Sequence, residues 1–266
     1  MRSYLILAMS LTLVACESVQ TTQPGAVGIE RRQTMLVSDE EITKAAVQEY
    51  HKVLADAQAK GKLDRNPQHV QRVRAVLSRL AAQTAAFRLD APKWPWEIHV
   101  IEDAQLNAWA MPGGKMVVYS GLIDKLRLTD DELAAIMGHE IAHSLREHAR
   151  ERVSQEMATG LAIGVAGAAL GLGDMGQQLA GALANVTFSL PHNRTQETEA
   201  DRLGVELAAR AGYDPHAAVN IWQKMVQAAG SGGPQFLSTH PSPETRLADL
   251  RVYADRVMPL YQQARR

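Results

Sequence analysis

The sequence predicts an α+β fold that is mostly helical and contains one small sheet with an antiparallel edge. Several segments repeat apolar residues at intervals of three and four, which is typical of amphipathic helices. Three short segments between residues 97 and 119 are instead typical of strands. The 266 residues are 46% hydrophobic, enough to bury a sizeable core in one main domain. The net charge is −1 and no long basic stripe is present, which argues against a nucleic-acid partner.

The first residues have the pattern of a signal peptide. Arg2 precedes an apolar run over residues 4–14 that is too short to span a bilayer as a mature helix. The run ends in Leu-Val-Ala-Cys, which resembles a bacterial lipobox, and Cys16 is the only cysteine of the chain. We therefore expect a signal peptide over residues 1–15, a lipidated Cys16 with a flexible tether over residues 16–36, and a folded domain over residues 37–266.

The lipobox also predicts a compartment. Glu17 follows the cysteine, instead of the aspartate associated with inner-membrane retention in enterobacteria. We therefore expect a protein of the bacterial periplasm that is bound to a membrane through its N-terminal lipid anchor, at the inner leaflet of the outer membrane. The oligomeric state does not follow from these residues.

Helices and strands follow along the rest of the chain. Gly61 separates the first two predicted helices, and Pro92 with Pro95 ends the second. The tripeptide Pro112-Gly113-Gly114 supplies a turn between two strands. The predicted helices cover residues 42–57, 70–87, 217–229 and 244–257, and the predicted strands cover residues 97–101, 108–111 and 115–119.

One further helix carries an H-E-x-x-H motif. A capping box at residues 129–132 predicts its start, and we expect it to extend over residues 130–154. His139 and His143 lie four residues apart on one face and can bind one Zn²⁺, while Glu140 beside the metal can deprotonate a water molecule. The motif therefore predicts a zincin-type metallopeptidase domain with one Zn²⁺ per chain.

Two neighbouring segments are interpreted from composition. His148 is rotated off the face of His143 and belongs to a charged run over residues 146–152, which predicts a solvated surface. Residues 157–193 are rich in glycine and alanine, with Asp174 as their only charged residue. Their uncharged run is too short to span a bilayer, so we expect a mobile or membrane-facing flap, or a helical hairpin, over the active site. A plain core hairpin is the alternative.

A catalytic zinc site needs a third protein ligand. The metzincin extension requires glycine and histidine where this chain has Arg146 and Ala149, so that class is excluded. Glu197 and Asp201 lie four residues apart on another predicted helix, where one carboxylate can bind zinc while the other accepts a hydrogen bond from a zinc-bound histidine. Glu199 is expected to face away. Without the zinc motif, compensation of the helix dipole would explain this acidic cluster equally well.

Four segments together resemble the HtpX-like and CAAX-prenyl-protease-like gluzincin peptidases, and within that family the periplasmic lipoprotein branch typified by LoiP and BepA. The segments are Asn107 to Gly114, His139 to His143, Glu197 to Asp201, and His240-Pro241 with Arg246. The family often has a Ser-Arg pair where this chain has Asn193-Arg194, and asparagine caps a helix equally well. The resemblance implies a compact peptidase without the tetratricopeptide domain of the BepA-like members.

The same resemblance implies roles for individual residues. Glu197 is implied to be the third zinc ligand, with Asp201 behind it. His240 and Arg246 are implied to lie near the zinc as catalytic groups that stabilise the developing oxyanion. The implied substrate-binding residues are Asn107, Ala108, Trp109 and Ala110. An extended peptide can pair with the edge of such a strand.

Motif and resemblance together predict a zinc-dependent endopeptidase that cleaves unfolded or misfolded exported proteins as quality control of the bacterial envelope. Glu140 would take the proton of the attacking water and later deliver it to the leaving amine. The alternative is a periplasmic chaperone or outer-membrane assembly factor whose zinc site is latent because His240 blocks it as a fourth ligand. A lipoprotein scaffold without metal is a third hypothesis, and it leaves Glu140 unexplained.

Overall fold

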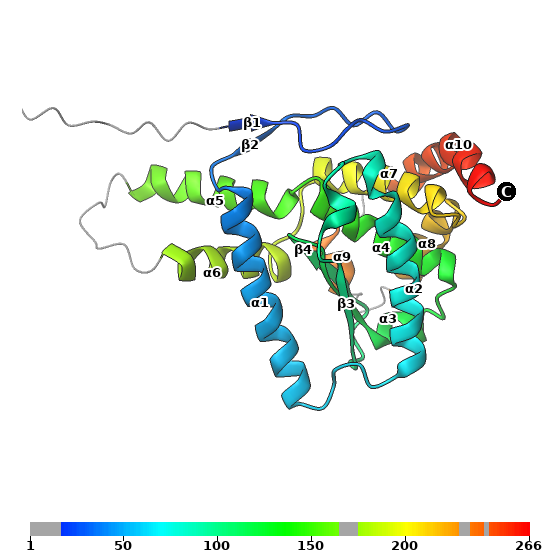
Figure 1. Ribbon diagram of the computed structural model, residues 1–266, viewed down its shortest axis with the longest axis horizontal. Coiled ribbons are helices and arrows are strands. Elements are labelled where there is room, and N and C mark those ends of the chain that lie inside the picture. Colours follow the sequence, from blue (N-terminus) through cyan, green and yellow to red (C-terminus); the bar gives the residue numbers. More distant parts are fainter. Residues whose placement is uncertain (1–16, 165–174, 229–234, 242–244) are drawn as a thin grey trace, which may run out of the picture.

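The computed structural model describes residues 17–164, 175–228, 235–241 and 245–266 (Figure 1). The strands are β1 Glu17–Val19, β2 Gln33–Met35, β3 Glu97–Ile101, β4 Ala108–Met111 and β5 Lys115–Tyr119. The α-helices are α1 Asp39–Ala59, α2 Pro67–Gln83, α3 Ser120–Lys125, α4 Asp130–Leu145, α5 His148–Gly164, α6 Met175–Phe188, α7 Arg194–Arg210, α8 Ala217–Gln227, α9 Gln235–Thr239 and α10 Arg246–Ala264. Two short 3-10 helices, η1 Thr84–Ala86 and η2 Ala91–Lys93, lie between α2 and β3. This architecture confirms the predicted α+β, mostly helical fold class.

The larger sheet has the strand order β3-β5-β4. Strands β3 and β5 are parallel, with Glu97 opposite Lys115, whereas β4 is antiparallel to β5, with Ala108 opposite Val118. The bounds of all three strands agree with the predicted segments. Within the part of the chain that the structure describes, β4 pairs with β5 alone and is therefore an edge strand.

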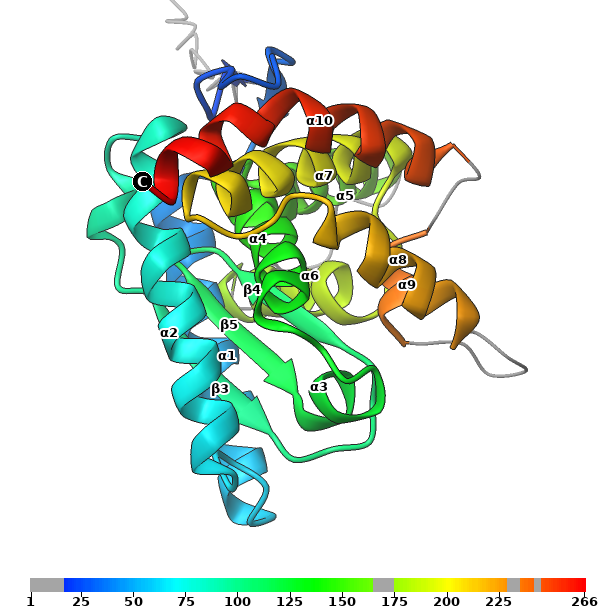
Figure 2. The ribbon, with the colours of Figure 1, turned by 90° about the vertical axis from the view of Figure 1, so that its right-hand side faces the viewer.

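Helix α4 lies at the centre of the domain, between the sheet and α7, and α10 covers the other side of α7 (Figure 2). Two glycines bring α4 and α7 unusually close. A Cβ atom on Gly138 would lie 2.9 Å from the carbonyl oxygen of Gly204, and one on Gly204 would lie 2.7 Å from the backbone nitrogen of His139. Because neither glycine has a Cβ, residues of α7 can reach the histidines of α4 with short side chains.

Helix α4 begins where the sequence predicts and ends earlier. Its capping box is formed: Thr129 Oγ1 accepts a hydrogen bond from the backbone nitrogen of Glu132 at 3.2 Å, and Glu132 Oε2 accepts one from that of Thr129 at 2.9 Å. The single helix predicted over residues 130–154 is wrong, because Arg146 and Glu147 separate α4 from α5. Glu147 has a φ of 51°, a left-handed conformation that ends an α-helix.

The charged run over residues 146–152 is buried, which corrects the prediction of a solvated surface. Arg146 is 0% exposed. The carboxylate of Glu147 accepts hydrogen bonds from Arg88 and, at 2.6 Å, from Arg150. Buried charges are tolerated when they are paired and hydrogen-bonded. Since Arg88 lies far away along the sequence, the local composition of the run could not reveal this pairing.

Residues 17–37, here called the N-terminal arm, are packed onto the domain, so the predicted flexible tether is wrong for the residues that the structure describes. Strands β1 and β2 form an antiparallel pair. Val27 and Met35 are each 2% exposed. The backbone nitrogen of Gln23 donates to the carbonyl of Phe87 at 2.8 Å, and that of Val27 donates to Glu206 at 3.0 Å. The predicted signal peptide and Cys16 lie outside the described residues.

Within the predicted flap or hairpin of residues 157–193, the described parts belong to two helices. Helices α5 and α6 pack against each other, and α6 also packs against α1 (Figure 1). Leu183 and Val186 of α6 are buried in an apolar cluster that includes Trp109 of β4. Helix α6 is thereby placed beside the edge strand. Among the residues that the structure describes, no helix is both long and apolar enough to cross a membrane.

Candidate metal centre

Four buried side chains from three segments converge beside α4. His139 and His143 come from α4, Glu197 comes from α7, and His240 directly follows α9. One ligand atom of each lies within 4.8 Å of those of the others. Each of the four residues is at most 5% exposed. The sequence motif and the resemblance therefore name residues that the fold brings together.

Both histidines of α4 direct their Nε2 atoms toward the same point. His139 Nδ1 lies 3.0 Å from Asp201 Oδ1, an ion-pair distance that falls short of hydrogen-bond geometry. His143 Nδ1 lies 2.8 Å from the Nδ1 atom of His148. Because the Nδ1 atoms face these partners, the two Nε2 atoms are left facing each other at 3.1 Å.

The spacing of the donor atoms fits a zinc ion. Bonds of about 2.0–2.1 Å around a tetrahedral centre separate the ligand atoms by about 3.4 Å. The two Nε2 atoms are 3.1 Å apart, and the carboxylate oxygens of Glu197 lie 3.4 Å from His143 Nε2 and 3.6 Å from His139 Nε2. Two imidazoles and one carboxylate also form one of the usual ligand sets of a catalytic zinc site. The residues present thus fit Zn²⁺.

The protonation states of the cluster suit a cation. Burial lowers the pKa of His143 to about 3 and holds the pKa of His139 well below its ordinary value, so both rings are neutral. Burial opposes ionisation of Glu197, but His240 and His143 outweigh it and hold the pKa of that carboxyl well below its usual range. Metal binding requires neutral imidazoles and an ionised carboxylate, and the chain supplies both.

Glu140 lies beside the cluster and has capacity to bind a proton. It is 3% exposed, and burial raises its pKa to about 7. Its Oε1 atom has no hydrogen-bond partner among the described residues and lies 3.4 Å from His240 Nε2. An unpartnered carboxylate oxygen next to a metal position is the geometry that a general base requires.

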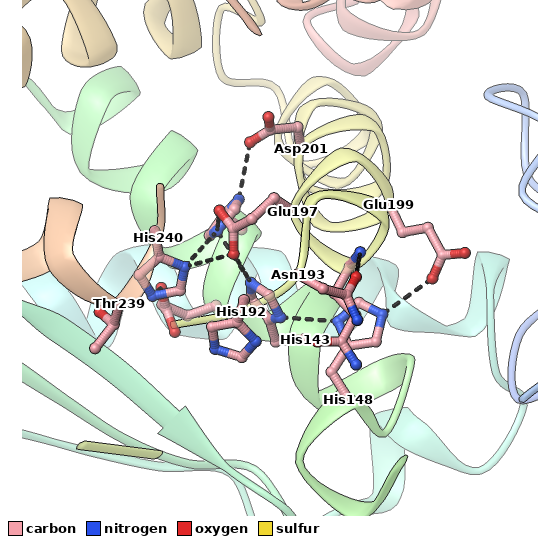
Figure 3. Close-up of polar contacts among 12 residues, drawn as sticks. His143, His148, His192, Asn193, Glu197, Glu199, Asp201, Thr239 and His240 are labelled. Atoms are coloured by element: carbon pink, nitrogen blue, oxygen red, sulfur yellow. Dashed lines mark hydrogen bonds and ion pairs between the residues drawn. The ribbon is translucent and has the colours of Figure 1, made fainter. Parts of the chain in front are cut away.

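His240 contacts Glu197 (Figure 3). Arg246 also contacts Glu197, but in a different way. His240 Nδ1 lies 2.9 Å from Glu197 Oε1 and 3.2 Å from His139 Nε2. Burial opposes protonation of His240, yet the charges of Glu197 and Glu140 raise its pKa. His240 is thus inside the cluster and next to Glu140.

Arg246 binds the carboxylates of Glu197 and Asp201. Its Nη1 atom donates to Glu197 Oε2 at 2.8 Å, its Nη2 atom donates to Asp201 Oδ1 at 2.6 Å, and its guanidinium lies 3.4 Å from the ring centroid of Trp222. Arg246 does not line the cavity described below. The oxyanion role implied by the resemblance does not fit these contacts, because the guanidinium is committed to the two carboxylates. Its contacts instead orient Glu197.

A cavity of about 390 Å³ opens on the side of Glu140. The four residues predicted to bind substrate, Asn107, Ala108, Trp109 and Ala110, lie along its wall. Val186 and Phe188 of α6 form another part of the wall, and the Phe188 ring packs edge-on against Trp109 at 5.2 Å between centroids. The edge strand, Glu140 and the cluster residues His143 and His240 therefore face one cavity, which has an apolar corner.

Two further histidines lie near the ligands, and their positions differ from what the sequence indicates. His148 is 0% exposed, and its Nε2 atom lies 3.0 Å from Glu199 Oε2. The expectation that His148 is solvated is wrong, because the break at Glu147 turns His148 back beside His143 (Figure 3). Glu199 lies outside the metal cluster, as expected, and its carboxylate is the partner of His148. No local signal indicates this burial, because partners of the run such as Arg31 and Glu199 lie far away along the sequence.

His192 packs against two members of the cluster and also lines the cavity. Its ring is stacked on that of His240 with centroids 4.9 Å apart, and its centroid is 4.1 Å from that of His143. Burial holds its pKa well below the ordinary value, so the ring is neutral. The residue precedes Asn193, whose side chain caps α7 by accepting from the backbone nitrogen of Gln196 at 2.9 Å, as the sequence predicts. This position beside the cap is the only sequence signal for His192.

Comparison with known proteins places the whole cluster in a matched region. Residues 67–254 match Peptidase family M48. The mitochondrial metalloendopeptidase OMA1 of Schizosaccharomyces pombe is 38% identical over 160 residues, which cover 59% of this chain and 46% of that protein. The beta-barrel assembly-enhancing protease of Yersinia pestis is 32% identical over 208 residues, which cover 73% of this chain and 40% of that protein. The beta-barrel assembly-enhancing protease of Escherichia coli is 34% identical over 186 residues, which cover 65% of this chain and 37% of that protein. The chain thus spans less than half the length of these relatives.

Proposed function

The chain belongs to peptidase family M48, and on this premise we propose that it is a zinc-dependent endopeptidase that cleaves unfolded or misfolded proteins of the bacterial cell envelope. One observation carries the proposal: His139, His143 and Glu197 place three zinc-ligand atoms together, and Glu140 lies beside them in a substrate-sized cavity. Similar proteins named as metalloendopeptidases and proteases support it.

The residues of the chain divide the work of peptide hydrolysis. When bound, Zn²⁺ supplies a Lewis acid that acidifies water and polarises the scissile carbonyl. Glu140 accepts the proton of the attacking water as its oxygen bonds to the carbonyl carbon. The same carboxyl then gives that proton to the amine nitrogen as the C–N bond breaks, so Glu140 ends the cycle ionised. His240 and His192 line the cavity and are the side chains placed to donate a hydrogen bond to the oxyanion.

The edge strand suits an unfolded substrate. Strand β4 has a free edge among the described residues, where an extended peptide can add as a further strand. Backbone pairing requires no particular sequence, while the corner formed by Trp109, Val186 and Phe188 favours an apolar side chain. Unfolded chains expose both extended backbone and apolar side chains. We extend the proposal to the described part of the Gly/Ala-rich segment, in which α6 forms one wall of this cavity and acts as a flap over a bound peptide.

The compartment is proposed on the N-terminal sequence. Lipidation of Cys16 would fix the protein to a membrane facing the periplasm, at the inner leaflet of the outer membrane, as in the LoiP and BepA branch. The named bacterial relatives support an envelope location, although the relatives also include mitochondrial proteins. Labelling with a palmitate analogue followed by membrane fractionation tests it. The wild-type chain should be labelled and sediment with membranes, whereas Cys16→Ser should be unlabelled.

A second candidate function follows from His240. All four side chains of the cluster, including His240, are close enough to share one ion, so a fourth protein ligand can close the site at rest. The protein would then act as a chaperone or assembly factor with a latent peptidase site. His240→Ala separates the two functions, because it raises proteolysis if His240 blocks the site and lowers it if His240 helps catalysis.

The main proposal is tested by removing the base and keeping the ligands. Wild-type protein loaded with one equivalent of zinc should degrade a chemically unfolded protein, and Glu140→Gln should lose activity by about 10²–10⁴-fold while binding the same amount of zinc. Glu40→Gln, an exposed substitution on α1, serves as the matched control and should cleave at the wild-type rate. Equal cleavage by the wild-type and Glu140→Gln proteins would contradict the proposal.

A further inference from the structure

A line of close polar contacts leads from the metal centre to the N-terminal arm. His143 Nδ1 lies 2.8 Å from His148 Nδ1, and His148 Nε2 lies 3.0 Å from Glu199 Oε2 (Figure 3). Glu199 Oε1 in turn accepts a hydrogen bond from Arg31 Nε at 2.6 Å. The three inner residues are buried, and the Arg31 side chain is 32% exposed.

The hydrogens along this line have one consistent order. If His143 binds the metal through Nε2, its Nδ1 atom carries a hydrogen and donates it to His148 Nδ1. His148 must then be neutral and carry its own hydrogen on Nε2, from which it donates to the ionised carboxylate of Glu199. The carboxylate fixes the tautomer of His148, which fixes the orientation of the His143 ring. Glu199 thus acts on the ligand through one intervening imidazole.

The N-terminal arm supplies the group that holds Glu199. Arg31 binds Glu199 with Nε and Nη2, and it binds Glu151 with Nη1 at 2.5 Å and Nη2 at 3.0 Å. Arg146 completes the network: its Nε donates to Glu199 Oε2 at 3.0 Å, and its Nη2 donates to the carbonyl of Arg31 at 2.9 Å. Arg31 therefore contributes both its side chain and its backbone to the environment of Glu199.

We propose that the N-terminal arm helps to hold the metal centre in its binding geometry. Arg31 of the arm positions the ligand His143 through Glu199 and His148. The inference rests on the proposed zinc site and extends it to residues outside the matched region 67–254. The arm is attached to the domain independently of Arg31, through buried Val27 and Met35. These apolar contacts remain when the Arg31 side chain is removed, so a substitution there tests the ion pairs to Glu199 and Glu151 while the arm keeps its buried residues. Partners behind metal ligands typically change metal affinity by about 10–100-fold.

Zinc affinity of the full chain, measured by competition with a chromophoric chelator, tests the proposal. His148→Ala should weaken zinc binding by about 10–100-fold, and Arg31→Ala by about 3–10-fold because it acts one step further away. His148→Gln retains one acceptor and one donor and should recover most of the loss. Arg32→Ala is the matched control, since Arg32 carries the same charge but bonds Ser18 within the arm, and it should bind zinc as the wild type does.

Two further measurements separate positioning from folding. The visible absorption of the Co²⁺-loaded protein reports ligand geometry, and it should shift in His148→Ala and Arg31→Ala but not in Arg32→Ala. Thermal unfolding of the metal-free variants shows which of them fold; if His148→Ala does not, His148→Gln and Arg31→Ala decide the matter. Wild-type affinity and an unchanged cobalt spectrum in Arg31→Ala and His148→Ala would overturn the inference. Failure of the wild-type protein to bind zinc would instead overturn the proposed function.

Discussion

The two histidines of the H-E-x-x-H motif are oriented by two different regions of the molecule. His139 faces a carboxylate directly, since Asp201 on α7 lies 3.0 Å from its Nδ1 and is held by Arg246. His143 faces the imidazole of His148, and His148 in turn contacts the carboxylate of Glu199. The first region lies within the matched residues 67–254, whereas the second reaches into the N-terminal arm. Two ligands of the same motif can therefore be oriented by residues from quite different parts of the chain.

The largest effect is expected where the two regions meet, at Glu197. Glu197→Gln keeps the size of the side chain but removes the charge that pairs with Arg246 and completes the ligand set. Zinc affinity should fall by more than the about 100-fold typical of residues behind the ligands. Metal content after dialysis measures this loss. Asp249→Asn is the control: it removes a carboxylate that binds Arg202, which lies on α7 like Glu197, and it should leave the metal content unchanged. Retention of zinc by Glu197→Gln would contradict the role of Glu197 as a ligand.

If the two regions act independently, substitutions in each should lower zinc affinity less than Glu197→Gln does, and their effects should combine in a predictable way. Asp201→Asn should weaken zinc binding by about 10–100-fold through His139. Combined with Arg31→Ala, the fold-changes should multiply, because the two residues share no partner and distant sites add in free energy to within about 0.5 kcal/mol. Chelator competition on both single variants and the double variant measures the coupling. A double variant that is no weaker than Asp201→Asn alone would show that the two regions act as one.

The smallest effect is expected on stability, at the close approach of Gly204 on α7 to the backbone of His139 on α4. Gly204→Ala places a Cβ within 2.7 Å of the His139 backbone nitrogen, so the helices must separate. We expect a loss of about 1–3 kcal/mol in the free energy of unfolding, measured on the metal-free protein in urea. Gly181→Ala on α6, where a Cβ meets nothing within 4 Å, is the control and should gain about 0.5–1 kcal/mol. Equal stability of the two variants would show that the close approach is not required.

Much of the first region could be predicted from the sequence, since its signals are local. Alternating residues and a Pro-Gly-Gly turn define β3, β4 and β5, and the capping box defines the start of α4. The spacing of His139, His143 and the acidic pair 197 and 201 places these residues on helix faces. Periodicity was sufficient here because each group needs only its own helix to point the right way.

The second region could not be predicted because it depends on contacts between distant segments. Nothing local indicates that Glu147, which is not a glycine, adopts a φ of 51° and ends α4. His148 is buried only because that break turns it toward Glu199, and Glu199 is satisfied only because Arg31 reaches it from the arm. A polar, glycine- and proline-containing arm has the composition of a linker, and its buried partners are visible only in three dimensions.

The contact between Gly138 and Gly204 also bears on which ion the centre accepts. Ligand distances differ between cations: about 2.0–2.2 Å for zinc and about 2.3–2.6 Å for calcium, which also takes more oxygen ligands. The two glycines set how near the carboxylate of Glu197 comes to the imidazoles, and this narrow spacing suits a small ion with few ligands. We therefore expect the absence of two methyl groups from the helix interface, away from the donor atoms themselves, to favour a small divalent ion.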